Sequence, residues 1–260
     1  MPMIKQGYFI DGNTKLYYER FGIGETIVFL HGFSLDHRMW QDQIDIFASE
    51  YQVLTYDMQG FGRSTIPTKQ YSHYEDLHKL LSFLKIDKIH LVGLSMGGEA
   101  AIEFTLKYPS KVRSLCVIDS SIDGYSENVD WTVHKKEEGI EIAKQNWLNH
   151  KVFETTVKNA KVKKKLTKIM ELYSGWHWFN NDPREHVYPK SVNRLSEISV
   201  PTLIIVGEKD LPYFISQSKI LNQEIKASEL LIIPGVGHMS NMESPQAVNM
   251  ALTNFLDNHQ

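Results

Sequence analysis

Short apolar runs alternate with longer segments of helical period along most of the chain. The runs are mostly continuous rather than alternating in polarity, and they span residues 26–32, 51–57, 88–95, 112–119, 201–210 and 229–235. Continuous apolar runs are typical of strands that are covered on both faces, as in parallel sheets. Before them, residues 8–19 form two alternating runs around Asp11-Gly12-Asn13, a pattern that predicts an antiparallel hairpin. The sequence therefore predicts an α/β fold whose central sheet is mostly parallel and flanked by helices.

The spacing of the strands breaks once, between residues 120 and 200. This stretch has no comparable apolar run, but residues 135–157 and 163–179 show helical patterns. It also contains most of the tryptophans: Trp131, Trp147, Trp176 and Trp178. We interpret residues 121–196 as a helical cap inserted after the sixth strand. Residues 1–120 and 197–260 would then form the core.

A serine stands where the apolar run at residues 88–95 gives way to a helical segment. Gly93-Leu94-Ser95-Met96-Gly97 matches the pattern G-x-S-x-G at a strand-to-helix junction, the context that gives this motif its meaning. A sharp turn there leaves no room for a Cβ at the flanking glycines and lifts the serine oxygen clear of the sheet. The following helix points its positive N-terminal end at the same place. The sequence thus predicts that Ser95 is a nucleophile rather than a simple turn residue.

A serine hydroxyl needs a base to take its proton, and the base needs a carboxylate to orient it. With this motif the chain order is serine, then acid, then histidine. His238 lies in a glycine-rich loop after the last predicted strand, which makes it the candidate base. Asp210, just past a strand end, is the favoured acid, while Glu208 and Asp119 remain alternatives.

The oxyanion that forms on attack requires N–H donors that are already in place. The residue after the nucleophile supplies one, so we expect the backbone N–H of Met96 to take this role. The loop after the first long strand would supply the second from the N–H of Phe33. Ser34 would add a hydroxyl to the pocket, and His31 is interpreted as a packing and hydrogen-bonding residue rather than a base.

Composition and charge exclude several classes of protein. The chain has 260 residues, enough for one large domain, and its net charge of −3 provides no broad basic face for nucleic acid or an anionic membrane. The one basic run, residues 161–168, is interpreted as a solvated helix face. The single cysteine, Cys116, rules out an intrachain disulfide. We see neither a signal peptide nor a membrane-spanning run, so we expect a cytoplasmic protein. The apolar residues form no obvious exposed stripe, so we expect a monomer or a weak dimer.

Four separated blocks together resemble the α/β-hydrolase superfamily, in its serine-nucleophile branch of carboxylesterases and enol-lactonases. They are residues 31–40, 57–64, 93–98, and the pair 207–210 with 235–245. The second block is similar to the family's D-x-x-G-x-G-x-S loop, with Asp57, Gly60, Gly62 and Ser64 in place and Gln59 as a minor departure. The resemblance implies that this loop is structural and holds the oxyanion turn. It also implies the α/β-hydrolase fold, with the insertion at the position of the family's cap.

The resemblance also narrows the reaction. Haloalkane dehalogenases and epoxide hydrolases of this fold carry an aspartate nucleophile, which Ser95 argues against. Met239 follows His238 where carbon–carbon bond hydrolases often have tryptophan, and Ser34 replaces the proline of haloperoxidases. We therefore predict hydrolysis of carboxylic esters with small acyl or aromatic groups through an acyl-enzyme. The alternatives are a lactone or carbon–carbon bond hydrolase, and a slow-turnover small-molecule receptor.

The remaining expectations concern the pocket. Trp147, Trp176 and Trp178 of the insertion, together with Ser34 and Met239, would line an apolar substrate site. The alternative is that these tryptophans only anchor helices of the insertion to the core. No cysteine or histidine group has the spacing of metal ligands, so we expect no metal and no cofactor.

Overall fold

A single eight-stranded sheet forms the centre of the computed structural model, which describes residues 5–126, 129–132 and 139–259. The strands run in the order β1-β2-β4-β3-β5-β6-β7-β8. Their bounds are β1 Lys5–Asp11, β2 Thr14–Phe21, β3 Thr26–Leu30, β4 Gln52–Tyr56, β5 Ile89–Leu94, β6 Val112–Ile118, β7 Thr202–Gly207 and β8 Ser228–Ile233. Strands β3 to β8 all run parallel to one another, whereas β2 is antiparallel to both β1 and β4. The predicted hairpin is confirmed, because Asp11 pairs with Thr14 across the turn.

Apolar side chains pack on both faces of the sheet. Ile27 and Phe29 of β3 join one hydrophobic cluster, while Val28 and Leu30 join the other. Successive side chains of a strand point to opposite faces, so a strand covered on both sides needs apolar residues at every position. The prediction that these strands are covered on both faces is wrong for β8, which lies at the sheet edge and leaves Ile232 42% exposed.

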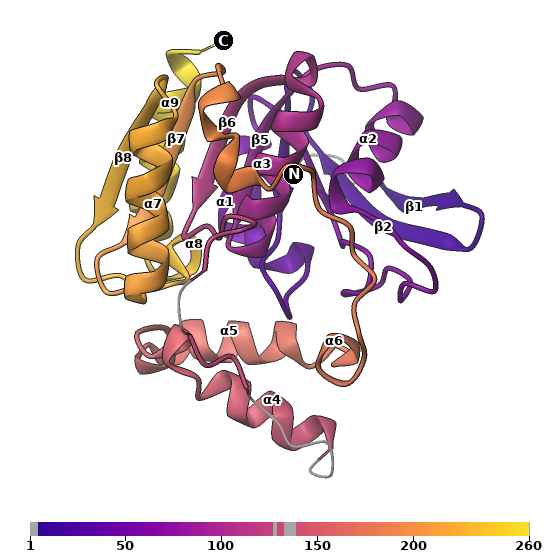
Figure 1. The fold of residues 1–260 in the computed structure, drawn as a ribbon, viewed down its shortest axis with the longest axis vertical. Coiled ribbons are helices and arrows are strands. Elements are labelled where there is room, and N and C mark those ends of the chain that lie inside the picture. The colour runs from indigo at the N-terminus through magenta and orange to yellow at the C-terminus, as the bar shows by residue number, and fades with distance from the viewer. Residues whose placement is uncertain (1–4, 127–128, 133–138, 260) are drawn as a thin grey trace.

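Helices cover both faces of the sheet (Figure 1). In the described residues the α-helices are α1 Gln41–Phe47, α2 His73–Leu84, α3 Met96–Lys107, α4 Ile140–Leu148, α5 Ala160–Met170, α6 Trp176–Phe179, α7 Pro212–Glu224, α8 Ser240–Glu243 and α9 Pro245–Asp257. Helices α7 and α9 begin with proline, whose missing N–H costs nothing in a first turn. Helix α5 begins after Asn159, whose side-chain oxygen accepts hydrogen bonds from the N–H groups of Lys161 and Val162.

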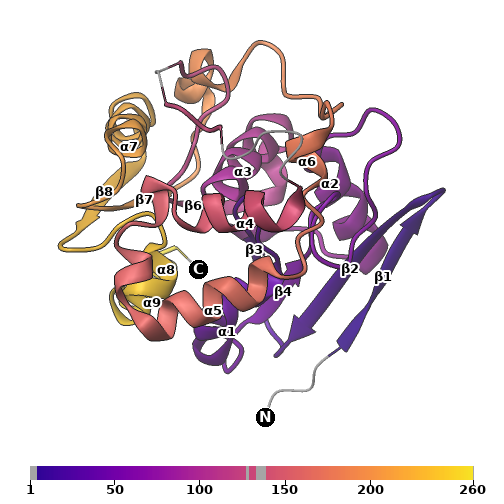
Figure 2. The ribbon, with the colours of Figure 1, turned by 90° about the horizontal axis from the view of Figure 1, so that it is seen from below.

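Helices α4, α5 and α6 lie between β6 and β7 in the chain and form a separate layer in space (Figures 1 and 2). The first predicted helical segment, residues 135–157, contains α4 and two short 3₁₀ turns, and its first residues, 135–138, lie outside the described residues. The basic run forms part of α5, where Val162 and Leu166 are buried and Lys161, Lys163 and Lys164 are exposed. The division into core and cap remains a prediction. Within the described residues, no helix combines the length and the apolar character needed to cross a membrane.

Candidate active site

Ser95 stands in a strained turn between β5 and α3. Its backbone has φ 57° and ψ −119°, a region that residues with a Cβ rarely adopt. Among the described residues, its side chain caps no N–H group of α3, so the hydroxyl is not used to begin the helix. Ser95 is partly exposed and lines a pocket. The turn therefore presents this oxygen to the pocket, as expected for a nucleophile.

The glycines around Ser95 are required by close backbone approach. A Cβ at Gly93 would overlap the carbonyl group of Gly97, and a Cβ at Gly97 would overlap the carbonyl oxygen of Leu30. The start of α3 therefore rests directly on the end of β3. This contact brings the N-terminal end of α3 beside the loop that follows β3, where the oxyanion is expected to form.

His238 and Asp210 approach each other across two loops. His238 follows β8 and Asp210 follows β7, and the His238 Nδ1 lies 2.9 Å from Asp210 Oδ2. Both residues are buried, with 5% and 6% of their surfaces exposed. A carboxylate can only accept a hydrogen bond, so the imidazole donates from Nδ1 and keeps Nε2 as the basic nitrogen. Burial raises the pKa of Asp210, and the charge and hydrogen bond of His238 oppose this effect.

The alternative acids make other hydrogen bonds. Asp119 accepts from the N–H of Gly207 and from both the N–H and the hydroxyl of Ser240. It thus joins the ends of β6 and β7 to the start of α8, and burial together with the nearby Asp210 carboxylate raises its pKa. Glu208 is exposed and accepts from the N–H of Gly235. Of the three candidates, Asp210 is the one that contacts the imidazole.

The loop after β3 is held by a buried hydrogen-bond network. The N–H of Met58 donates to His31 Nε2, so His31 donates from Nδ1 to the carbonyl oxygen of Gly32 at 2.8 Å. Asp57 accepts from the N–H of His37 through Oδ1 and from the N–H of Arg63 through Oδ2. Burial lowers the pKa of His31, which favours the neutral imidazole. This geometry agrees with a structural role for the loop around Asp57.

Phe33 and Met96 border the pocket on either side of the junction between β3 and α3. Met96 is the first residue of α3, so its N–H belongs to the first turn, which has no partner within the helix. The centroid of the Phe33 ring lies 5.9 Å from that of Trp147 and 6.3 Å from that of Trp178. The loop expected to stabilise the oxyanion is therefore packed against the inserted helices. The assignment of both N–H groups to the oxyanion remains a prediction.

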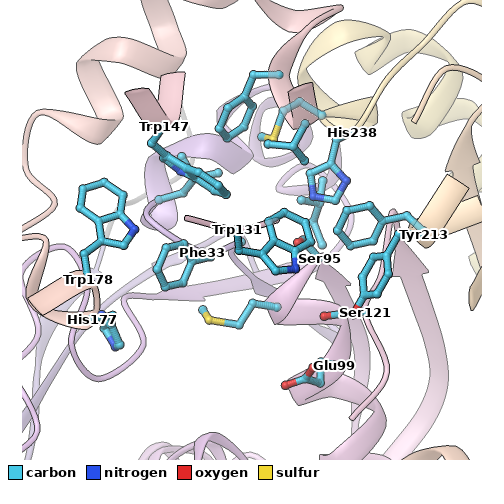
Figure 3. Close-up of a pocket in the computed structure, with 18 of the residues that line it drawn as sticks. Phe33, Ser95, Glu99, Ser121, Trp131, Trp147, His177, Trp178, Tyr213 and His238 are labelled. Carbon is cyan, nitrogen blue, oxygen red and sulfur yellow. The ribbon is translucent and has the colours of Figure 1, made fainter. Parts of the chain in front are cut away.

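The pocket has a volume of about 480 Å³, and aromatic side chains form a large part of its wall (Figure 3). Ser95 and His238 both line it, together with Trp147, Trp178 and Met239 from the predicted set. The other aromatic residues of the wall are Phe33, Trp131, Phe153, Tyr213 and Phe214. Ser34 and Trp176 were also predicted to line the pocket, but they are not among the described residues that line it. Trp176 instead stands edge-on to the ring of His177, at a centroid distance of 4.9 Å.

Ser34 has a different role from the one predicted. It is fully buried, and its hydroxyl accepts a 2.7 Å hydrogen bond from Trp147 Nε1. The serine therefore fixes an aromatic wall residue of α4 to the loop after β3, instead of presenting its hydroxyl to the substrate.

Replacing Ser34 with alanine should destabilise the protein by about 1–2 kcal/mol, because the buried indole N–H loses its acceptor. Chemical denaturation measures this change. The freed Trp147 ring should also raise KM more than it lowers kcat. A variant with unchanged stability and unchanged KM would show that the hydrogen bond does not position the ring.

One end of the pocket is polar, and sequence reasoning did not find it. Glu99, Ser121, Asp182 and Arg184 line this end, and Arg184 Nη2 donates to Glu99 Oε1 at 2.9 Å. Figure 3 draws Glu99 and Ser121 away from Trp147. Glu99 lies four residues after Ser95, one helical turn along α3, and that spacing is the one signal that could have identified it. Asp182 and Arg184 follow α6 in an irregular segment that carries no such signal.

Comparisons with known proteins agree with this architecture. The model of the alpha/beta hydrolase family matches residues 27–251, so the chain belongs to that family and is a hydrolase of this class. It is 27% identical to 3-oxoadipate enol-lactonase 1 of Acinetobacter baylyi, over 90% of each chain. It is 29% identical to the 2-hydroxy-6-oxononadienedioate/2-hydroxy-6-oxononatrienedioate hydrolase of Klebsiella pneumoniae, covering 89% of this chain and 87% of the relative. A thermophilic esterase from Thermogutta terrifontis, solved with malate bound, superimposes with a TM-score of 0.81 at 25% identity, covering 98% of this chain and all of the other.

Proposed function

We propose that the protein hydrolyses carboxylic esters with small acyl or aromatic groups through an acyl-enzyme on Ser95. The observation that carries the proposal is the combination of a strained, partly exposed Ser95 with a His238 that borders the same pocket and contacts Asp210 at 2.9 Å. An arrangement of serine, histidine and carboxylate performs acyl transfer on several unrelated folds.

In the proposed mechanism, Ser95 Oγ attacks the ester carbonyl carbon while His238 Nε2 takes the hydroxyl proton. The Asp210 carboxylate holds the imidazole in the required tautomer and stabilises its charged form. The N–H groups of Phe33 and Met96 stabilise the oxyanion. His238 then gives the proton to the departing alcohol. A water molecule, deprotonated by His238, releases the acid and restores Ser95.

The shape of the pocket supports small and medium substrates. A cavity of about 480 Å³ is within the usual range for small-molecule sites, and its aromatic wall favours an apolar acyl or aryl group. The named activities of the similar proteins include an enol-lactonase and an esterase, which supports a reaction at an ester bond.

Activity on p-nitrophenyl esters should peak at short or medium acyl chains, because a cavity of about 480 Å³ limits the length that fits. The measurement is kcat/KM for linear chains from acetyl to dodecanoyl, with lactones and ring-cleavage products assayed in parallel. A maximum on lactones or on vinylogous diketo acids would replace the ester assignment with one of the alternatives. Tight ligand binding without turnover would favour a receptor.

A further inference from the structure

Three potential metal ligands meet where the inserted segment joins the core. Glu103 comes from α3, Asp123 from the chain just after β6, and His186 from the segment that returns toward β7. The His186 Nδ1 lies 2.8 Å from Glu103 Oε1 and 3.8 Å from Asp123 Oδ1. One ligand atom from each residue lies within 4.8 Å of the others.

Two oxygen atoms of this cluster are buried without a partner. Glu103 Oε2 and Asp123 Oδ2 have no hydrogen-bond partner among the described residues, and Glu103 is only 1% exposed. A carboxylate oxygen removed from water without a partner is costly, so such an atom in a native protein calls for an explanation, such as a bound ion.

The neighbouring positive charge of Arg184 balances this cluster only in part, because it is shared between Glu99 and Glu103. Arg184 is the closest guanidinium, and its Nη2 donates to Glu99 Oε1. Glu99 also lies 3.7 Å from His186 Nδ1 and adds a third carboxylate near the imidazole. Glu103 Oε1 accepts from the N–H of Val187 in addition to its contact with His186. Arg184 makes its hydrogen bond to Glu99. The two carboxylates that face His186 most directly, Glu103 and Asp123, carry two negative charges.

We propose that Glu103, Asp123 and His186 bind a divalent transition-metal ion, with zinc as the best match. Zinc takes imidazole nitrogen and carboxylate oxygen ligands at about 2.0–2.2 Å, so two ligands of a tetrahedral ion lie about 3.3 Å apart. His186 Nδ1 lies 2.8 Å from Glu103 Oε1 and 3.8 Å from Asp123 Oδ1, so these two distances lie on either side of that value. Calcium and magnesium prefer shells made of oxygen, so the imidazole favours zinc over both. Two carboxylates and a neutral imidazole would neutralise the ion.

A second group with similar composition provides a contrast. Asp36, His37 and Asp57 are also close together and buried. There, the oxygens of Asp36 accept from Arg38, and those of Asp57 accept from His37 and the N–H of Arg63. These lone pairs are already engaged, whereas the cluster around Glu103 leaves buried oxygens free.

A metal at this position would connect α3 to both ends of the inserted segment. Asp123 and His186 lie close to the two points where the chain leaves and re-enters the core, and α3 begins directly after Ser95. Arg184, two residues before His186, lines the substrate pocket. The ion would thus hold the polar end of the pocket in place without taking part in the reaction.

The test is zinc binding to the full chain after treatment with EDTA and desalting. Calorimetric titration with zinc chloride should give one ion per chain, and cobalt(II) should produce the visible absorption of a four-coordinate ion. Glu103→Gln and His186→Gln should each weaken zinc binding by more than about ten-fold, because each removes a ligand. Zinc should also slow hydrogen exchange in residues 121–126 and 184–187 of the wild type.

His259→Gln is the matched control, since it removes a half-buried histidine near the C-terminus and should leave zinc binding unchanged. Asp123→Asn is a second ligand variant in case Glu103→Gln does not fold, which circular dichroism would reveal. The proposal is overturned if the wild type takes up no zinc, which would make the cluster an ion pair with protonated His186. It is equally overturned if the ligand variants bind zinc as the wild type does, which would indicate adventitious binding elsewhere.

Discussion

Replacing Ser95 with alanine should lower kcat/KM for the best ester by at least about 10⁴-fold while the fold remains stable. Alanine removes the attacking oxygen, but it suits the strained backbone of the turn as well as serine does. The residual rate would come from the oxyanion donors and substrate binding alone. Steady-state kinetics and thermal unfolding, measured on the same preparation, test both parts of the expectation.

Covalent labelling sharpens this test. An organophosphonate should modify Ser95 of the wild type and fail to modify the alanine variant, as peptide mass spectrometry would show. Ser121→Ala is the control, because Ser121 also lines the pocket but is not in the strained turn. We expect a change of less than about ten-fold in that variant, since no nucleophile is lost. Labelling at Ser121, or full activity without Ser95, would contradict the assignment of the nucleophile.

Replacing Asp210 with asparagine should lower kcat by about 10³–10⁴-fold with a small change in stability. Asparagine keeps the shape of the side chain but removes the charge that stabilises the imidazolium and the acceptor that fixes the tautomer of His238. The measurement is kcat at saturating ester across the neutral pH range.

Asp119→Asn should give the opposite pattern. The carboxylate oxygens of Asp119 accept from Gly207 and Ser240, and an amide nitrogen cannot accept, so a buried donor is left unpaired. We expect a loss of about 1–3 kcal/mol in stability and a far smaller loss in kcat than for Asp210→Asn. Glu208→Gln should alter neither property. If Asp119→Asn abolishes activity in a well-folded protein while Asp210→Asn does not, the acid is Asp119.

Much of the fold could be predicted because its signals are local. The hairpin around Gly12 depends on a turn of a few residues, and the buried strands depend on apolar runs whose period needs no knowledge of their neighbours. The turn at Ser95 is local in part: Gly93 is required by contact with Gly97 in the same junction, whereas Gly97 is required by contact with Leu30 of the adjacent strand. The order of the chemical groups along the chain then identified His238 and Asp210 as candidates.

Other features depended on which distant segments meet. The apolar residues of β8 resemble those of a central strand, and only the strand order places Ile232 at an exposed edge. Ser34 was predicted to face the pocket, but its hydroxyl accepts a hydrogen bond from the indole N–H of Trp147, which lies far away in the chain on α4. The helical pattern around Trp176 indicated a helix without indicating which of its faces would meet the pocket.

Local patterns were enough to predict the strands and the serine turn, because these depend mainly on residues close together in the chain, and known motif order named the candidate groups for acyl transfer. Only the folded structure shows which carboxylate contacts His238, how the pocket acquires its polar end, and that Glu103, Asp123 and His186 meet. Contacts between residues far apart in the chain depend on the packing of whole elements, and side-chain spacing in the sequence carries no record of that packing.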